Sequence, residues 1–383
     1  MKIKLAQIKY KQADFEYNYN QITKKHDSNV DLMIYPDVNS TNSMDFDSNY
    51  KKQKEEFFEK LCENFKNNIV LIGDKLIKNG KLYNILNGYF DCQNKKIYVS
   101  NEYKDNVKCD LYVLAKNSYY TINSHENFIE NIVPQQDFIY VNSIMLSDEN
   151  VFAGQSFAKN SKNEIVAELP LLEEKVEEIN FKNKAKLTNS DENEEIFKVT
   201  TFAMKEYCEN TGFKKVVLGL SGGIDSALTA VLAKEAMGAE NVYAIMLPSK
   251  YSSEGSITDS EKLVKNTGIN VKTTPIKPLF DCFMENVAEE NKMDLAEENL
   301  QSRLRGIILM FASNRDNCLL LSTGNKSEVA CGYGTLYGDM CGGFNPIADL
   351  TKTNVYKLSN WINRNGEIIP QEIIDKAPSA ELR

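Results

Sequence analysis

A short glycine-rich segment is the strongest sign of chemistry in this sequence. The residues SGGIDS, at positions 221–226, follow an apolar run typical of a buried strand (214–220) and precede a helical pattern. A phosphate bound at such a turn would meet backbone N–H groups at a helix N-terminus, where the helix dipole favours anions. Gly222 and Gly223 would let the backbone approach it closely with positive φ angles. The segment therefore predicts a phosphate site, with its two serine hydroxyls as further donors.

A carboxylate in the same segment points to a metal ion. Asp225 would repel a bound phosphate unless Mg²⁺ lay between the carboxylate and the phosphate oxygens. The segment lacks the G-K-[ST] ending of a Walker A loop, so transfer of a γ-phosphate is not expected. The same residues also suit an ordinary Gly-Gly turn with a serine as the helix N-cap, and spacing alone leaves this alternative open.

The second half of the chain has the pattern that would position this turn. Apolar runs at 214–220, 241–249, 270–276 and 317–325 alternate with helical patterns. This rhythm predicts parallel strands with right-handed crossovers, as in a Rossmann-like, doubly wound parallel sheet.

The first half alternates in a similar way, which predicts a layered α/β fold. Between 168 and 195 the composition becomes charged and poor in aromatic residues, as in an exposed linker, although one more surface helix would also fit. We place the boundary near Lys186 and expect two domains, 1–185 and 186–383, in keeping with a chain of 383 residues.

Composition narrows the classes of partner. A net charge of −9 argues against nucleic acid as the main partner, because phosphate backbones attract basic surfaces. The sequence shows no apolar run of membrane-spanning length and no signal-peptide pattern, so we expect no membrane partner and a cytoplasmic location. Its eight cysteines form no CxxC pair and indicate reduced thiols, and with only two histidines a zinc site is not expected.

The segment LGLSGGIDSALTAVLA (218–233) resembles the pyrophosphate loop of the N-type ATP pyrophosphatases, whose fold is adenine nucleotide alpha hydrolase-like. Four further blocks resemble NAD⁺ synthetases within that group: residues 246–261, 297–306, 321–358 and 373–383. The resemblance implies that ATP and Mg²⁺ are used to amidate deamido-NAD⁺ with ammonia, through an adenylated intermediate. It also implies a homo-oligomer, and further active-site residues beyond Arg383.

The resemblance implies a role for each matching residue. Those implied for ATP are Gly219, Leu220, Ser221, Gly222, Gly223, Ile224, Asp225, Ser226, Met246, Thr323, Lys352 and Ser379. Those implied for deamido-NAD⁺ are Asn299, Glu328 and Asp339. Mg²⁺ would bind Asp225 and Glu328, and these two with Lys352 would be catalytic. Ordinary alternatives stay open, since Met246 also suits a core position, Thr323 a strand end and Glu328 the first turn of a helix.

The first half, to about Val166, resembles a nitrilase-fold glutaminase, an α-β-β-α sandwich that releases ammonia from glutamine with a Cys, a Glu and a Lys. Here Asp37 stands at the Glu position. Between KIYVSNEYKDN (96–106) and VKCDLYVLAK (107–116) the chain lacks the segment that carries the family's Lys and Cys. Cys109 lies near this gap but matches no nucleophile position. We therefore expect a degenerate glutaminase domain and free ammonia as the nitrogen donor.

Two other functions stay open at this stage. One is a different adenylating amidotransferase acting on a nucleobase or tRNA, which the acidic net charge disfavours. The other is a non-catalytic, nucleotide-binding scaffold or regulatory homologue. The retained Asp225, Glu328, Asp339 and Lys352 argue against a scaffold, which has no need of metal and phosphate ligands.

Overall fold

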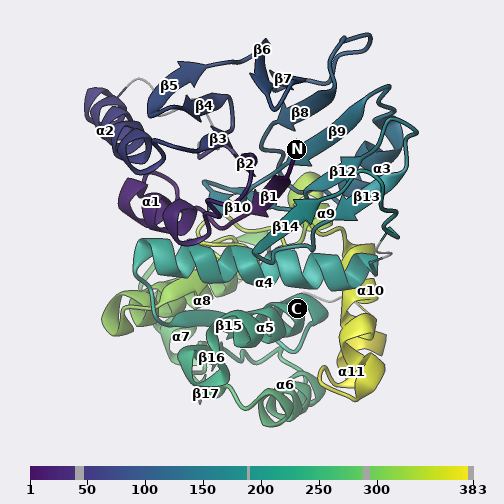
Figure 1. Cartoon of the computed structure of the whole chain (residues 1–383). Helices are drawn as coiled ribbons and strands as arrows, with labels where there is room; N and C mark the ends of the chain where they lie inside the picture. The colour runs from purple at the N-terminus through teal and green to yellow at the C-terminus, as the bar shows by residue number, and fades with distance from the viewer. Residues whose placement is uncertain (39–46, 188–189, 288–293, 378–383) are drawn as a thin grey trace. The chain divides into compact units, whose positions relative to one another are not determined.

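The chain forms two compact units, Met1–Glu192 and Asn193–Arg383. The computed structural model describes residues 1–38, 47–187, 190–287 and 294–377. Figure 1 follows the chain from purple at the N-terminus to yellow at the C-terminus. Within the described residues no helix is both long and apolar enough to cross a membrane.

The first unit contains two six-stranded sheets, ordered β14-β1-β2-β3-β4-β5 and β13-β12-β9-β8-β7-β6 (Figure 1). The first sheet comprises β1 (Ile3–Gln7), β2 (Leu32–Tyr35), β3 (Ile69–Ile72), β4 (Lys75–Lys78), β5 (Lys81–Asn84) and β14 (Lys175–Ile179). The second comprises β6 (Gly88–Cys92), β7 (Lys95–Ser100), β8 (Leu111–Ala115), β9 (Asp137–Val141), β12 (Phe157–Lys159) and β13 (Ile165–Glu168). A separate hairpin joins β10 (Ile144–Ser147) to β11 (Asn150–Ala153). The helices are α1 (Phe15–Lys24), α2 (Ser48–Asn64) and α3 (Ser124–Asn131).

Both faces of each sheet are covered, because successive residues of the central strands point to opposite sides and both sets are buried. In β2, Leu32 and Ile34 join a core between the two sheets, while Met33 and Tyr35 join a second core beneath α1 and α2. Likewise, Tyr112 of β8 packs with residues of α3 on the outer face of the second sheet. These layers are the expected α-β-β-α sandwich.

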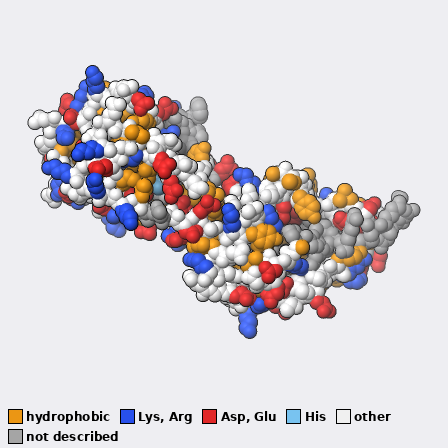
Figure 2. Space-filling model, turned by 90° about the vertical axis from the view of Figure 1, so that its right-hand side faces the viewer, with side chains coloured by type: hydrophobic (Ala, Val, Ile, Leu, Met, Phe, Trp, Pro, Cys, Tyr) orange, Lys and Arg blue, Asp and Glu red, His pale blue; other side chains and the backbone are white. Residues whose placement is uncertain are grey.

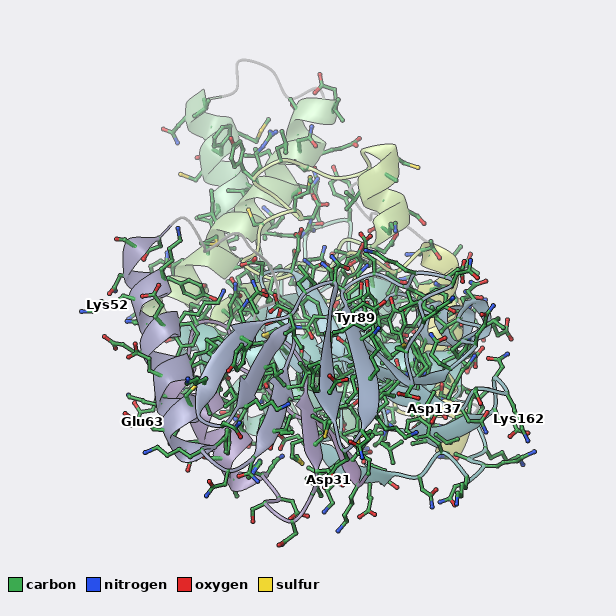
Figure 3. All side chains as sticks on the ribbon, turned by 45° about the horizontal axis from the view of Figure 1, so that its top comes forward. Asp31, Lys52, Glu63, Tyr89, Asp137 and Lys162 are labelled. Carbon is green, nitrogen blue, oxygen red and sulfur yellow. The ribbon has the colours of Figure 1, made fainter. Side chains whose placement is uncertain are left out.

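Helix α2 shows how an outer layer is held in place. Phe57, Phe58 and Leu61 are buried against the first sheet. Its polar residues Lys52 and Glu63 point away from the sheet (Figure 3). Apolar residues on one side of the helix thus fix its position, and charged residues on the other meet water.

One strand of this unit lies where the sequence predicted a linker, and one strand pairing has an unusually short connection. The charged stretch expected to be a linker contains β14, an edge strand that pairs antiparallel with β1. Its sequence KVEEI looks like a linker because most of it is at least partly exposed. In the second sheet, β7 pairs directly with β8 in parallel, across a connection of only ten residues (101–110). Parallel neighbours normally need a dozen or more connecting residues.

The second unit is built on a four-stranded, all-parallel sheet with the order β17-β16-β15-β18. The strands are β15 (Val216–Leu220), β16 (Val242–Met246), β17 (Asn270–Thr273) and β18 (Leu319–Leu321). The helices are α4 (Glu192–Thr211), α5 (Ile224–Met237), α6 (Glu254–Thr267), α7 (Lys277–Val287), α8 (Leu295–Asp316), α9 (Lys326–Cys331), α10 (Lys352–Ile362) and α11 (Gln371–Asp375). All four strands fall where the apolar runs predicted them, in the expected parallel, doubly wound arrangement.

The strand order identifies where a ligand would bind. From β15 the chain adds β16 and then β17 on one side, and returns later to add β18 on the other. The order therefore reverses between β15 and β18, and in open α/β sheets ligands bind at the carboxyl ends of the strands beside such a switch point. The glycine-rich turn follows the carboxyl end of β15.

We expect a fragment of residues 186–383 to fold by itself, because its sheet lies wholly downstream of Lys186 and compact units usually fold as units. Circular dichroism and the fluorescence of Trp361, the chain's single tryptophan, measure this. A soluble fragment with a cooperative unfolding transition is the expected result. An aggregated or uncooperative fragment would place a folding requirement in residues 1–185.

Candidate functional site

The glycine-rich turn joins β15 to α5 and approaches α6 closely. Gly222 has a φ of +79°, and a Cβ atom there would come within 2.5 Å of the Ser256 carbonyl oxygen in α6. Only glycine fits both the backbone conformation and the space. The N-cap of α5 is Gly223, which offers no side-chain cap, so the first N–H groups of this helix face the turn without a capping hydroxyl.

The two serines of the turn hold its shape. The Ser226 hydroxyl accepts from the Ser221 N–H at 3.2 Å and donates to the Gly223 carbonyl at 3.0 Å. It also lies 3.1 Å from the Ser221 hydroxyl. Ser226 is buried in the first turn of α5, so here it braces the loop in which the backbone N–H groups are presented.

The N-terminal ends of α5, α9 and α10 bring together four polar residues: Asp225, Asn325, Glu328 and Lys352. Asp225 lies in the first turn of α5, Glu328 in the first turn of α9, and Lys352 is the first residue of α10. Asn325 is the N-cap of α9, and its side-chain amide donates to Asp225 Oδ1 at 2.9 Å. The Lys352 ammonium donates to Asp225 Oδ2 and lies 3.8 Å from Glu328 Oε1.

The neighbouring charges affect the protonation of Glu328. Burial, and then the negative charge of Asp225, raise the pKa of the Glu328 carboxyl above its usual value. The Asn325 N–H, which donates to Glu328 Oε2 at 3.1 Å, and the charge of Lys352 oppose this rise in pKa. A cation beside the two carboxylates would therefore offset their mutual repulsion.

The donor set fits Mg²⁺ shared with a phosphate ligand. Asp225 and Glu328 supply carboxylate oxygens, which are hard ligands of the kind Mg²⁺ prefers. Among the described residues no group of three or more His, Cys, Asp or Glu side chains could hold a metal alone. Mg²⁺ commonly binds through one or two carboxylates and substrate phosphates, and this pair matches that mode.

A second cluster lies on α8 and the segment that follows α9. The Asp339 carboxylate accepts from the Ser302 hydroxyl and from the Thr335 N–H, both at 2.8 Å. The Thr335 hydroxyl donates to Asn299 Oδ1 at 2.9 Å. The charge of Asp339 also contributes to the raised pKa of Glu328, so the two clusters lie within electrostatic reach of each other.

The other residues with expected roles gather at the same edge of the sheet. Gly219 and Leu220 end β15, Met246 ends β16, and Thr323 follows β18. Met246 is buried, and its sulfur lies 4.0 Å from the Thr273 hydroxyl at the end of β17. Ile224 is buried at the start of α5. Ser379 lies outside the described residues.

Sequence reasoning missed two contributors to this site. Asn325 is the last residue of the apolar run 317–325 and had no predicted role, yet it bonds Asp225, one hundred residues earlier, and caps α9. The N-x-x-E spacing of a capping box was the available signal. Lys376, whose ammonium contacts the Ser256 hydroxyl at the start of α6, had no signal beyond its place in a matched block.

In the first unit the residues at the expected glutaminase site bond one another. The Asn117 amide donates to the Asp37 carbonyl at 2.9 Å, just beyond the carboxyl ends of β8 and β2. The Tyr10 hydroxyl donates to the Pro36 carbonyl at 3.2 Å. The Asn142 amide donates to the carbonyls of Ser118 and Gly154. Polar groups at this edge thus tie the strand ends together.

Cys109 is poorly placed to act with Asp37. It precedes β8, whereas Asn117, which contacts Asp37, follows the same strand. At roughly 3.3 Å per residue the two ends of this segment are more than about 15 Å apart. Burial, and then the charge of Asp110, raise the pKa of the Cys109 thiol to about 11, so almost no thiolate exists near neutral pH.

The chain is similar to proteins that make NAD⁺. Residues 196–383 match the family model described as NAD synthase. The glutamine-dependent NAD(+) synthetase of Synechocystis sp. is 45% identical over 256 residues, which cover 64% of this chain and 46% of that protein. The Rhodobacter capsulatus protein of the same name is 42% identical over 266 residues, covering 64% of this chain and 48% of that protein. The chain thus spans about half the length of the curated relatives it matches.

Solved structures resemble the chain over nearly its whole length. A glutamine-dependent NAD⁺ synthetase from Acinetobacter baumannii, in complex with ADP, has a TM-score of 0.88 at 27% identity, over 99% of this chain and 85% of that one. A Cytophaga hutchinsonii synthetase has a TM-score of 0.82 at 16% identity, over 98% and 84%, which is a likeness of fold alone.

The geometry of the turn predicts a contrast between two glycine substitutions. Gly222 and Gly268 both have positive φ, at +79° and +72°, but a Cβ atom at Gly268 meets nothing within 4 Å. Gly268→Ala should lower the free energy of unfolding by about 1 kcal/mol, the strain of the backbone conformation alone. Gly222→Ala should lower it by at least about 2 kcal/mol, because the methyl group also strikes the backbone of α6.

Denaturant titration followed by Trp361 fluorescence reports on the second unit, which contains this residue. Equal losses of stability in the two variants would contradict the close contact between the turn and α6.

Proposed function

We propose, from the premise that residues 196–383 form an NAD synthase domain, that this chain amidates deamido-NAD⁺ to NAD⁺ at the expense of ATP. One observation carries the proposal. The glycine-rich turn lies at the switch point of the sheet, and Asp225, Glu328 and Lys352 meet beside it. Such a site suits a nucleotide whose phosphates are bound by backbone N–H groups and by charges of both signs.

The reaction follows from the poor reactivity of a carboxylate toward ammonia. The nicotinate carboxylate of deamido-NAD⁺ attacks the α-phosphorus of ATP, and pyrophosphate leaves. Ammonia then attacks the acyl adenylate, a proton is released, and AMP leaves with the bonding electron pair. The sum is deamido-NAD⁺ + ATP + NH₃ → NAD⁺ + AMP + PPᵢ, with no covalent bond to the protein.

Different residues of the site would bind the phosphates, the metal ion and deamido-NAD⁺. The N–H groups at the start of α5 bind phosphate oxygens, and Gly222 and Gly223 allow their close approach. Lys352 carries a positive charge toward the leaving pyrophosphate. Asp225 and Glu328 would hold Mg²⁺, which when bound supplies positive charge at the phosphate oxygens. Asn299 and Asp339, fixed through Thr335, would orient deamido-NAD⁺.

The same proposal assigns the remaining ATP contacts. Met246 and Thr323, at the carboxyl ends of the two strands that flank β15, would lie near the nucleotide, and Ser379 would approach the reacting phosphate. A cytoplasmic location is part of the proposal. Nucleic acid is not a partner in it, and Figure 2 shows Lys and Arg interspersed with Asp and Glu on the face that it draws.

We propose further that free ammonia is the nitrogen donor, although the relatives named above are called glutamine-dependent. Three observations support this. Asp37 stands at the expected Glu position, β7 and β8 pair directly where the segment with the family's Lys and Cys would lie, and Cys109 has a raised pKa. A nucleophile, its base and an oxyanion donor act as a unit, and losing one member disables it.

An assay of NAD⁺ formation tests both proposals. With ATP, Mg²⁺ and deamido-NAD⁺, we expect turnover with ammonium and less than about 1% of that rate with millimolar glutamine alone. Asp225→Asn should slow the ammonium reaction by two decades or more, about 3 kcal/mol, because the substitution keeps the shape and removes the charge that would hold the metal.

Cys109→Ala serves as the control in the glutamine arm and should change nothing. Glutamine-driven synthesis that disappears in this variant would show that the first unit is an active glutaminase. Absence of turnover with either donor would favour the nucleotide-binding scaffold.

We also propose a homo-oligomer formed through α7 and α8, which pack against each other. Ile307 and Phe311 of α8 are 60% and 61% exposed, and Phe283 of α7 is also exposed. Large exposed apolar side chains on neighbouring helices are typical of a protein interface.

Sedimentation velocity at micromolar concentration should show a dimer or larger species. Phe311→Glu should shift it toward monomer, because a charge is costly in a buried apolar interface. Lys265→Glu, on the exposed side of α6, is the control and should leave the assembly intact. A monomeric native protein would contradict the proposal.

A further inference from the structure

We propose that the Lys352 ammonium holds the place of a divalent cation between Asp225 and Glu328, and gives it up only when Mg²⁺ arrives with a nucleotide. The protein alone would then bind divalent cations weakly. The inference rests on the proposed function for the identity of the nucleotide, and on the geometry of the side chains for the rest.

Each carboxylate, of Asp225 and of Glu328, has one oxygen that contacts Asn325 and one that faces Lys352. Asp225 Oδ1 accepts from the Asn325 side chain at 2.9 Å, and Glu328 Oε2 accepts from the Asn325 N–H at 3.1 Å. The remaining oxygens, Asp225 Oδ2 and Glu328 Oε1, both face the Lys352 ammonium, the first in a hydrogen bond and the second at 3.8 Å. One cation thus serves the two oxygens that Asn325 leaves available.

This arrangement matters because the group is largely withdrawn from water. The side chains of Lys352, Asp225 and Glu328 are 24%, 17% and 30% exposed. Two carboxylates brought together in such surroundings repel, and a positive charge between them offsets this. An ammonium group and a divalent cation would compete for this one position, because each is stabilised by the same two oxygens.

The Lys352 side chain can move while the start of α10 stays in place. Its backbone N–H donates to the Ser327 hydroxyl of α9 at 3.0 Å, which fixes the start of α10. The charge sits at the end of a flexible four-carbon stem. The ammonium can therefore pass from the carboxylates to a phosphate oxygen while the backbone stays bonded to α9.

The coordination chemistry of Mg²⁺ explains why it would bind together with the phosphates rather than before them. It requires about six oxygen ligands in octahedral geometry, and the described residues here offer it one carboxylate pair. Binding to the protein alone would expel Lys352 and leave its charge without this partner. When a polyphosphate supplies the missing oxygens, it also gives the expelled ammonium a new anionic partner.

The test is the affinity of the full chain for Mn²⁺, a spectroscopic substitute for Mg²⁺, in the absence of nucleotide. Electron paramagnetic resonance measures the free ion directly. Lys352→Met keeps the apolar stem and removes the charge, and we expect it to bind Mn²⁺ at least tenfold more tightly than the native protein. Lys357→Met, an exposed position on the same helix, should leave the affinity unchanged.

Two further variants keep the experiment decisive. Adding Asp225→Asn to Lys352→Met should abolish the gain, which places the ion at this carboxylate. Lys352→Gln should reproduce the gain, and thermal unfolding followed by Trp361 fluorescence verifies that each variant is folded. Folded Lys352 variants that bind Mn²⁺ no more tightly than the native protein would overturn the proposal.

The outcome is independent of NAD⁺ synthesis, because no substrate is present. A protein that shows the gain in Mn²⁺ affinity but no turnover with deamido-NAD⁺ would contradict the proposed function and support the exchange of cations.

Discussion

Two carboxylates cannot be kept close together away from water unless other groups hold them there, and this constraint organises the second unit. Asn325 fulfils it by bonding Asp225 with its side chain and Glu328 with its backbone. To reach both, it caps α9 a few residues after β18, while Asp225 lies in the first turn of α5, a few residues after β15. This contact requires β15 and β18 to be neighbours, as they are at the switch point. It also requires a helix to follow each of the two strands after a short turn.

The glycine-rich turn depends on a second close approach. Gly222 meets the backbone of Ser256 in α6, and Ser226 closes the turn from inside α5. The N-terminal ends of two helices are thereby fixed near the same point. The positive ends of their dipoles favour an anion there, and they also offset part of the negative charge of the carboxylate pair nearby.

The sequence was sufficient for features that depend on neighbouring residues, and insufficient for features that depend on distant ones. Apolar runs located the strands of the second unit, and the paired glycines located the turn, because strand burial and positive φ are local demands. The bond between Asn325 and Asp225 joins positions one hundred residues apart, and no local pattern encodes it.

The strand β14 was mistaken for a linker because an exposed edge strand carries the charged composition of a loop. The bracing role of Ser226 was hidden for a related reason, since a hydroxyl serves a ligand or the turn equally well.

The short connection between β7 and β8 makes the architecture of the first unit resistant to gradual change. The five residues of β8 pair with β9, and four of them also pair with β7. A strand inserted between β7 and β8 would first have to break the ladder between these two strands, and its own hydrogen bonds would form only after the sheet had opened. Single substitutions therefore cannot lead from this sheet to one with an additional central strand by small steps. The hydrogen bonds between β7 and β8 thus close the centre of this sheet to a further strand.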